Sequence, residues 1–265
     1  MSGFSPDWLA LREPADHASI NAAVRAACVR VFAGRDIVRI FDLGCGTGSN
    51  LRSLAPALGV RQHWMLIDND PALLEIAGTS AALNGVEVAC KRVDLASVEF
   101  RPLLSGADLV TASALFDLFS VEAIERLAAA VAAERCAFYT VLTYDGIAAF
   151  LPEHPADGAM REAFDRHQRT DKGFGPAAGP NASDALAAAF ARYGYRVLRG
   201  KSPWVLDAHQ RKLRRELERG WASAVRETGL VPPATVDEWL DHRNAASSAV
   251  TIIGHEDLLA IPSTA

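Results

Sequence analysis

The stretch IVRIFDLGCGTGSN, residues 37–50, joins an apolar run to a turn with three alternating glycines. The apolar run, residues 37–43, predicts a buried strand. The glycines at positions 44, 46 and 48 lack a Cβ atom, so the backbone can adopt unusual φ values and pass close to a ligand. Their G-x-G-x-G spacing differs from the G-x-G-x-x-G of dinucleotide binders. The stretch therefore predicts a strand that ends in a ligand-binding turn, and it argues against a nicotinamide dehydrogenase.

Apolar runs and helical patterns alternate after this turn. The runs are HWMLID (63–68), VEVACKRVD (86–94), ADLVTASAL (107–115) and CAFYTVLTY (136–144). Asp70 and Pro71 open one helical pattern, with Asp70 as the cap, and VEAIERLAAAVAAE (121–134) forms another. Such alternation predicts an α/β fold with a doubly wound, mostly parallel sheet.

The flanking segments complete a single predicted domain over residues 1–265. Residues 1–35 are predicted to form an N-terminal helical lid that ends at Gly34, and residues 36–145 form the core. Residues 146–182 are rich in proline and glycine, which predicts a long lid loop with one helix near 157–166. For residues 183–265 we expect a helix capped by Ser183, a strand YRVLRG (195–200), a helix after Asp207, a short helix with a Thr235–Glu238 capping box, and a last strand AVTIIGHEDLLAIP (249–262).

The composition of the 265 residues is that of a folded globular protein, with 50% hydrophobic and 22% charged residues. The net charge of −5 argues against a partner that is bound mainly through phosphates. The sequence shows neither a membrane-spanning run nor a signal peptide, so we expect no membrane partner and a cytoplasmic location. The four cysteines, at positions 28, 45, 90 and 136, form no C-x-x-C pair, and we expect no metal.

Carboxylates follow three of the predicted strands. Asp42 ends the first strand and suits an amino-acid moiety, Asp68 ends the second and can accept two ribose hydroxyls, and Asp94 follows the third. The alternative is that the glycines mark only a tight turn, that Asp68 caps a helix and that Asp94 is a loop acid. Because the carboxyl ends of parallel strands share one edge of a sheet, we expect the three acids to face a single crevice.

These residues resemble the class I S-adenosylmethionine (SAM)-dependent methyltransferase family over residues 35–145. The resemblance implies a seven-stranded sheet with the order 3-2-1-4-5-7-6, SAM as cofactor and S-adenosyl-L-homocysteine (SAH) as product. It also implies that the three glycines line the methionine part, that Asp68 holds the ribose, and that Asp94 and Leu95 bind the adenine. Arg12 is expected to pair with the methionine carboxylate, or alternatively with Glu13 or Asp16. The expected cofactor residues are Arg12, Asp42, Gly44, Cys45, Gly46, Gly48, Asn50, Asp68, Asn69, Asp94, Leu95 and Ser113.

In this family the exits of strands four and five face the transferable methyl group. The fourth exit lacks the N-P-P-[FY] signature of enzymes that methylate adenine or glutamine amino groups. Asp117 is a candidate base or substrate anchor, or alternatively a cap, although Ser120 suits the cap better. Tyr144 and His167 complete the candidate catalytic set, and His167 has a surface position as its alternative.

We therefore expect methyl transfer from SAM to an O, N or S atom of a small-molecule acceptor, by in-line displacement. The alternatives are a protein or RNA methyltransferase and a SAM-binding module without catalysis. Residues 211–219, with a net charge of +3, are expected to be a solvated helix face, and Trp204, Trp221 and Trp239 are expected in the core. The sequence identifies neither the acceptor nor the oligomeric state.

Overall fold

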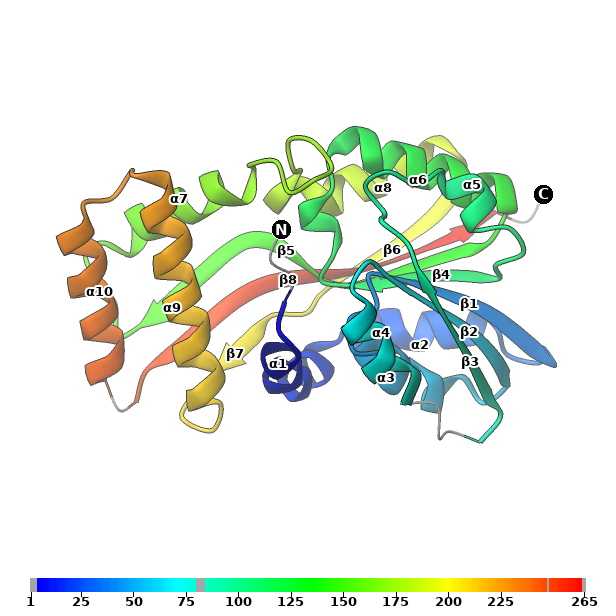
Figure 1. The fold of residues 1–265 in the computed structure, drawn as a ribbon, viewed down its shortest axis with the longest axis horizontal. Helices are drawn as coiled ribbons and strands as arrows, with labels where there is room; N and C mark the ends of the chain where they lie inside the picture. The colour runs from blue at the N-terminus through cyan, green and yellow to red at the C-terminus, as the bar shows by residue number, and fades with distance from the viewer. Residues whose placement is uncertain (1–3, 80–83, 247, 264–265) are drawn as a thin grey trace.

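One mixed sheet organises the protein. The computed structural model describes residues 4–79, 84–246 and 248–263, so the predictions for residues 1–3, 264 and 265 lie outside the described residues. The strands are β1 (Ile37–Leu43), β2 (Arg61–Asp68), β3 (Val86–Arg92), β4 (Leu109–Ser113), β5 (Ala137–Leu151), β6 (Tyr195–Lys201), β7 (Trp204–Leu206) and β8 (Val250–Pro262). Their order is β3-β2-β1-β4-β5-β8-β6, and β7 pairs with β8 (Figure 1).

This order confirms the predicted fold class. The pairs β1–β2, β1–β4, β2–β3 and β4–β5 are parallel, and β8 runs antiparallel to β5 and β6. The strand predicted over residues 195–200 is present as β6, and β7, a short strand that was not predicted, follows it after Ser202 and Pro203. Counted as one strand, these two pieces give the predicted order 3-2-1-4-5-7-6.

Helices cover both faces of the sheet. They are α1 (Pro6–Ser19), α2 (Ala22–Val31), α3 (Ser49–Leu58), α4 (Pro71–Thr79), α5 (Phe100–Leu103), α6 (Val121–Glu134), α7 (Asp157–Gln168), α8 (Ala182–Arg192), α9 (Arg211–Thr228) and α10 (Pro233–Ala245), with 3₁₀ turns η1 (Phe116–Leu118) and η2 (Gly179–Asn181). Figure 1 shows α1 to α4 on one face and α5, α6 and α8 on the other. Within the described residues, no helix has the length and apolar character needed to cross a bilayer.

Each face of the sheet has its own apolar core. Ile40 and Trp64 pack on the side of α2 and α3, whereas Val110 and Phe138 pack on the side of α6 and α8. All four side chains are at most 1% exposed. Two buried layers of this kind explain why the central parallel strands β1 and β4 are mostly apolar, whereas the edge strand β3 is largely exposed.

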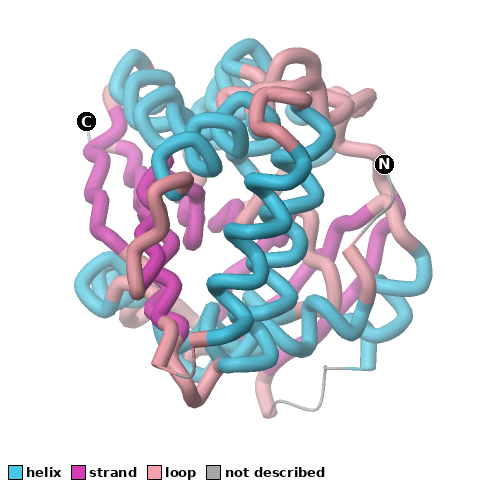
Figure 2. Tube along the Cα trace, turned by 90° about the vertical axis from the view of Figure 1, so that its left-hand side faces the viewer, coloured by secondary structure: helices cyan, strands magenta, loops and turns pink. Residues whose placement is uncertain are grey.

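The sheet continues beyond this core as a second region, which we call the extension: residues 144–168, 204–246 and 248–255. Here the ends of β5 and β8, together with β7, are covered by α7, α9 and α10 (Figure 1), and Figure 2 views the molecule from this end. Trp221 of α9 stacks on Phe164 of α7 with ring centroids 3.6 Å apart, and Trp239 of α10 meets Phe150 of β5 at 5.0 Å. Trp204, Trp221 and Trp239 are 3%, 2% and 0% exposed, which confirms their predicted core positions.

The extension corrects the predicted loop over residues 146–182. β5 continues through Leu151, because its end pairs with β8 from Ala148↔Ile253 to Leu151↔Val250. The helix predicted near 157–166 is present as α7, so the irregular backbone that follows it is confined mainly to residues 169–178. The local pattern did not reveal the β5 extension because its partner lies about a hundred residues away in the sequence.

Several predicted helix ends are also wrong. Ser183 lies inside α8, where its hydroxyl donates a hydrogen bond to Glu256 instead of capping the helix. α10 begins at Pro233, so the predicted Thr235–Glu238 capping box falls within the helix. A proline at the first helical position favours this earlier start. The N-terminal helical segment is broken, and the side chain of Asn21 accepts hydrogen bonds from the amides of Ala23 and Val24 to cap α2.

The basic segment 211–219 is only partly the solvated face that the sequence suggests. Arg214 and Glu218 are 1% and 0% exposed, and their side chains form an ion pair at 3.0 Å. Glu218 also accepts a hydrogen bond from the hydroxyl of Thr251 on β8 at 2.6 Å. Two opposite charges on one helix are therefore buried where α9 packs on the extended strands.

Candidate active site

The glycine turn leaves β1 with three left-handed residues. Gly44, Gly46 and Gly48 have φ values of 60°, 53° and 83°. A Cβ atom at Gly44 would lie 3.0 Å from Leu115, and one at Gly46 would lie 3.2 Å from Leu9 of α1. Side chains are therefore disfavoured here both by the backbone conformation and by close neighbours.

Asp68 fixes the glycine turn from the end of β2. Its carboxylate accepts hydrogen bonds from the amides of Gly46 at 2.9 Å and Asp70 at 3.0 Å. A carboxylate has about four lone-pair positions, so two amide contacts leave capacity for further donors. Asp70 accepts a hydrogen bond from the amide of Ala72 at 2.8 Å, which confirms its predicted capping role.

A buried polar link lies behind the turn. The amide of Asn50 donates to Asp42 Oδ1 at 3.0 Å and to Thr111 Oγ1 at 2.9 Å, which joins β1, α3 and β4. Among the described residues, Asp42 Oδ2 is buried and has no hydrogen-bond partner. Burial raises the pKa of Asp42 to about 7. Asn50 thus links β1 and β4 through buried hydrogen bonds. The sequence analysis did not predict the hydrogen bond to Thr111.

The other expected cofactor residues lie at the same edge of the sheet. Asp94 follows β3, where its carboxylate accepts a hydrogen bond from the amide of Ala96 at 3.0 Å, and Leu95 is 6% exposed. Asn69 follows β2 and is exposed, and Ser113 is the half-buried last residue of β4. Cys45, in the turn itself, is buried, and its amide donates to the carbonyl of Ile67 at 3.0 Å. The parallel strand ends therefore bring these positions together with the glycine turn.

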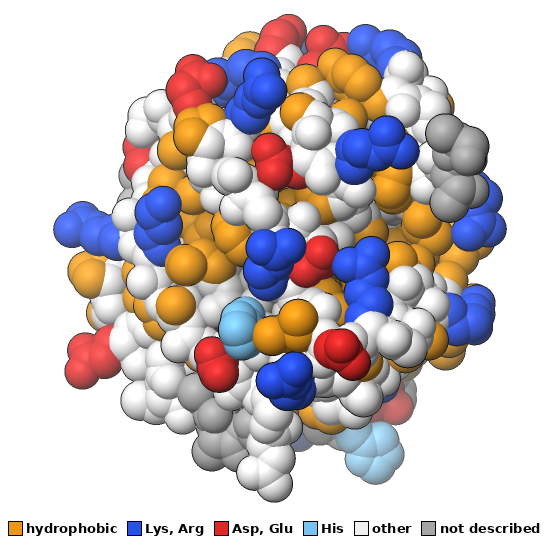
Figure 3. Space-filling model, turned by 90° about the vertical axis from the view of Figure 1, so that its right-hand side faces the viewer, with side chains coloured by type: hydrophobic (Ala, Val, Ile, Leu, Met, Phe, Trp, Pro, Cys, Tyr) orange, Lys and Arg blue, Asp and Glu red, His pale blue; other side chains and the backbone are white. Residues whose placement is uncertain are grey.

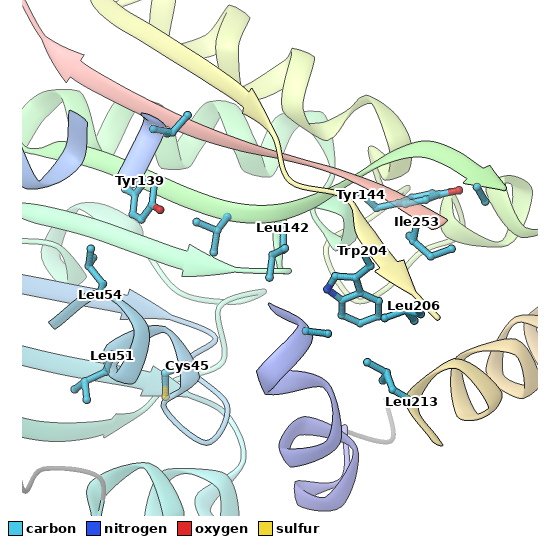
Figure 4. Packing of buried hydrophobic residues seen from close by; sticks show 14 of the residues in the cluster. Cys45, Leu51, Leu54, Tyr139, Leu142, Tyr144, Trp204, Leu206, Leu213 and Ile253 are labelled. Carbon is cyan, nitrogen blue, oxygen red and sulfur yellow. The ribbon is translucent and has the colours of Figure 1, made fainter. Parts of the chain in front are cut away.

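Helix α1 lies between the glycine turn and β7 (Figure 4). His17 Nε2 lies 3.1 Å from the carbonyl oxygen and 3.0 Å from the hydroxyl of Ser49. Glu13 pairs with Arg52, whose guanidinium also donates to the carbonyl of Thr47 at 2.6 Å. The N-terminal helix is thus tied directly to the start of α3.

Arg12 forms an ion pair with Asp16, which is one of the alternatives to the methionine carboxylate that the sequence left open. Its guanidinium donates to both carboxylate oxygens of Asp16, at 2.8 and 3.2 Å, and it lies 4.9 Å from the centroid of the Trp204 ring. Trp204 Nε1 also donates to Asp16 at 3.1 Å. The Arg12 and Asp16 side chains are only 12% and 8% exposed, so the pair is buried rather than on the surface.

Two non-glycine residues adopt left-handed backbone conformations at the exits of β4 and β5. Ala114 has a φ of 50° and its amide donates to the carbonyl of Val141 at 2.9 Å. Leu142 has a φ of 59° and its amide donates to Asp257 at 2.9 Å. Strained residues of this kind are enriched at functional sites, and here they mark the two strand exits that the sequence singled out.

Asp117 lies just beyond β4, in η1. Burial raises the pKa of its carboxyl to about 6, while the charges of Arg12 and Lys172 act in the opposite direction. Ser120 is the cap of α6, because its hydroxyl accepts a hydrogen bond from the amide of Ala123 at 3.1 Å. Asp117 is therefore not needed as the cap.

The other two candidate catalytic residues have partners of their own. Tyr144 is 5% exposed and its hydroxyl donates to Asp165 at 2.9 Å, and burial raises its pKa. His167 has Nε2 3.0 Å from Glu227 and Nδ1 3.5 Å from the ammonium of Lys172. The structure does not join Asp117, Tyr144 and His167 by direct hydrogen bonds, and both ring nitrogens of His167 are engaged.

Two residues of β8 were missed by the sequence analysis. His255 pairs with Tyr144 across the sheet and is 6% exposed, with its ring 5.3 Å from that of Trp204. Burial lowers its pKa to about 3, so the ring is neutral. Asp257 accepts hydrogen bonds from the amides of Asn21 and Leu142 at 2.7 and 2.9 Å. The sequence signal was the polar triplet His-Glu-Asp inside an apolar strand.

Comparisons with known proteins show which family model and which solved structures this chain is similar to. A family model described as a methyltransferase domain matches residues 40–134. The cyclopropane synthase MmaA2 from Mycobacterium tuberculosis has a TM-score of 0.52 at 10% identity, covering 97% of this chain and 94% of that one. The YcgJ protein from Bacillus subtilis has a TM-score of 0.50 at 14% identity, covering 92% and 100%. No curated protein matches the sequence.

The family match coincides with the part of the fold that carries the glycine turn. Residues 40–134 begin within β1 and end at the last residue of α6, so they include Asp42, Asp68 and Asp94. The two solved structures, at low identity, show the likeness of the fold alone. From the domain match and the sheet order, the chain contains a class I SAM-dependent methyltransferase domain.

Proposed function

We propose that the enzyme transfers the methyl group of SAM to an O, N or S atom of a small molecule. The observation that supports this acceptor class is the covering of the β4 and β5 exits by segments from distant parts of the chain. A small ligand needs an enclosed site that buries most of its surface, whereas a macromolecule needs an open approach.

The irregular segment 169–178 provides one part of the cover. Phe174 stacks on Phe119, just after η1, with ring centroids 4.0 Å apart. The amide of Ala178 donates to the carbonyl of Phe119 at 2.7 Å. These contacts fasten the segment over the turn that carries Asp117, and α1 with its Arg12–Asp16 pair supplies the opposite side. The two segments together favour a lidded acceptor crevice.

The turn and the strand ends suit SAM. The left-handed glycines let the backbone approach a ligand, and Asp42 offers a buried carboxylate oxygen without a partner. In this proposal the glycine turn and Asp42 bind the methionine part, Asp68 and Asn69 the ribose, and Asp94 and Leu95 the adenine. When bound, SAM supplies an electrophilic methyl group on its sulfonium.

The protein's part in the reaction is mainly alignment. Holding the nucleophile in line with the methyl group can lower the barrier by about 7–11 kcal/mol. Leu115 and Phe116 provide apolar walls, while Asp117 accepts a proton from an acceptor that still carries one at neutral pH. Tyr144 and His167 are then positioning groups, through Asp165 and Glu227.

The surface supports a small acceptor over nucleic acid. Figure 3, which views the end that carries β3, shows cations, acids and apolar side chains intermixed on this face. With a net charge of −5, the chain has no overall excess of positive charge to attract a phosphate backbone. We propose that residues 1–265 act as one domain, in which residues 1–35 and 146–182 help to enclose the acceptor.

A screen of candidate acceptors tests the proposal by following the release of SAH. Small alcohols, amines and thiols, with and without acidic groups, are compared with peptides and RNA under the same conditions. We expect turnover with members of one small-molecule class. Turnover confined to peptides or RNA would contradict the small-molecule assignment.

A further inference from the structure

Lys172 is an unusually placed cation. The chain has four lysines. Lys91 and Lys212 are exposed, and Lys201 is exposed and pairs with Asp145 at 3.0 Å. Lys172 is half-buried, and in the described part of the chain no carboxylate oxygen lies within 4.0 Å of its Nζ. Its ammonium is therefore partly removed from water without a direct counter-ion.

The histidine beside Lys172 is oriented to accept a hydrogen bond from the ammonium. His167 Nε2 lies 3.0 Å from the Glu227 carboxylate, so this nitrogen carries the proton and donates it. Nδ1 is left as an acceptor, 3.5 Å from Lys172 Nζ. The Glu227–His167 pair thus positions the ammonium without neutralising it at close range.

The backbone around Lys172 is held by contacts that do not use its charge. Asp171 accepts hydrogen bonds from the amides of Gly173 and Gly175, at 2.7 and 3.1 Å. Phe174 is fixed by its stacking on Phe119. The segment that carries the ammonium is therefore ordered before any ligand arrives, which reduces the entropy lost on binding.

Phe174, two residues after Lys172, stacks on Phe119, two residues after Asp117, so the segment of Lys172 packs against the turn that carries Asp117. The electrostatic influence of each residue reaches the other, whereas Arg12, the other cation near Asp117, is already paired with both oxygens of Asp16. Among the described residues, the carboxylates of Glu227 and Asp117 act on Lys172 only from beyond 4.0 Å, so its ammonium has no direct counter-ion. An anionic group on a bound ligand would supply that missing partner.

We propose that Lys172 is the anion-binding residue of the acceptor site, and that the acceptor carries a carboxylate or phosphate group in addition to the nucleophile presented to Asp117. This inference rests on the proposed function, because it assigns part of the acceptor to a named residue. Glu227 and His167 act as positioning residues for the Lys172 ammonium.

Lysine-selective NMR tests the proposal directly, since only four lysines contribute signals. Protein labelled with ¹³C at lysine Cε and saturated with SAH is titrated with acetate or with inorganic phosphate, with chloride at equal ionic strength as control. Lys172→Arg assigns the signal. We expect a saturable shift of the Lys172 signal with acetate for a carboxylate acceptor, or with phosphate for a phosphorylated one, while the exposed Lys212 does not saturate.

Matched variants complete the test. Lys172→Met is expected to weaken the binding of that anion by about tenfold or more, as for the loss of one charged hydrogen bond, whereas Lys212→Met leaves it unchanged. No saturable shift with either anion, or equal binding by wild type and Lys172→Met, would overturn the proposal. SAH calorimetry on the same samples reports the cofactor site independently, so a failure of the anion site is distinguishable from a failure of the methyltransferase assignment.

Discussion

The glycine turn and the extension are held in place in different ways. The turn is made of residues close in sequence, and its main contacts are backbone amides and carbonyls around Asp68. The extension joins side chains from distant segments, such as Tyr144 with Asp165 and Glu218 with Thr251. The glycine turn is thus built locally, whereas the extension is built by long-range packing.

We infer from this difference that the glycine turn and the extension have separate roles. The glycine turn depends on backbone conformation and on the absence of side chains at three positions, whereas the extension depends on the packing and pairing of buried side chains. Variants in one region should therefore leave the other region's property intact. Single variants can therefore test whether SAH affinity and the stability of the extension change independently.

Gly46→Val is expected to have the largest effect. Its Cβ would approach Leu9 at 3.2 Å with φ at 53°, so SAH binding should weaken more than about 100-fold, or about 2.7 kcal/mol. Gly229→Val is the matched control, because Gly229 has φ 65° and no atom within 4 Å of an added Cβ. Calorimetry should show normal SAH affinity in the control. Equal SAH affinity in the two variants would mean that the glycine turn does not contribute to cofactor binding.

Glu218→Ala examines the extension. It leaves Arg214 buried without its partner, so the free energy of unfolding should fall by about 3–5 kcal/mol. Glu216→Ala, at an exposed pair with Arg219 on the same helix, should change it by about 0–1 kcal/mol. Denaturant unfolding measures both changes. At a temperature where Glu218→Ala is folded, SAH affinity should be normal, and a parallel loss of affinity would show that the two regions are not separable.

Asp68→Ala is expected to weaken SAH binding by about 1.5–3 kcal/mol, because a charged acceptor for the ribose hydroxyls and the anchor of the Gly46 amide are removed. Asp70→Ala should instead reduce the free energy of unfolding by about 1 kcal/mol through the loss of a helix cap. Calorimetry and thermal unfolding of both variants separate the two effects. Exchanged phenotypes would mean that the ribose acid has been assigned to the wrong aspartate.

The same contrast explains what the sequence could and could not predict. The strand that ends at Leu43 and the Asp70 cap follow from local patterns, whereas the strand order was implied by the resemblance to the methyltransferase family. The continuation of β5 to Leu151 depends on pairing with β8, about a hundred residues later. The contacts of His167 with Glu227 and of Trp204 with Asp16 are likewise set by tertiary packing, which periodicity does not encode.

The smallest expected effect is a pH dependence of stability at the glycine turn. Burial raises the pKa of Asp42 in the folded protein to about 7, from 3.8. The folded state therefore holds this proton more strongly, and stability decreases as the pH rises from about 4 to about 7. Asp42→Asn cannot ionise, so relative to wild type its free energy of unfolding should gain about 1 kcal/mol between pH 6 and pH 7. Unfolding at both pH values checks this, and an unchanged difference between the two proteins would contradict the buried charge.

Hydrogen exchange with and without SAH is the sharpest test of these separate roles, because it reports on the glycine turn and the extension in one experiment. We expect SAH to protect residues 42–50, 66–70 and 93–97 and α1 from exchange. The exchange of α7, α9 and α10 should be unchanged. Protection concentrated in the extension, with the glycine turn unaffected, would contradict this expectation.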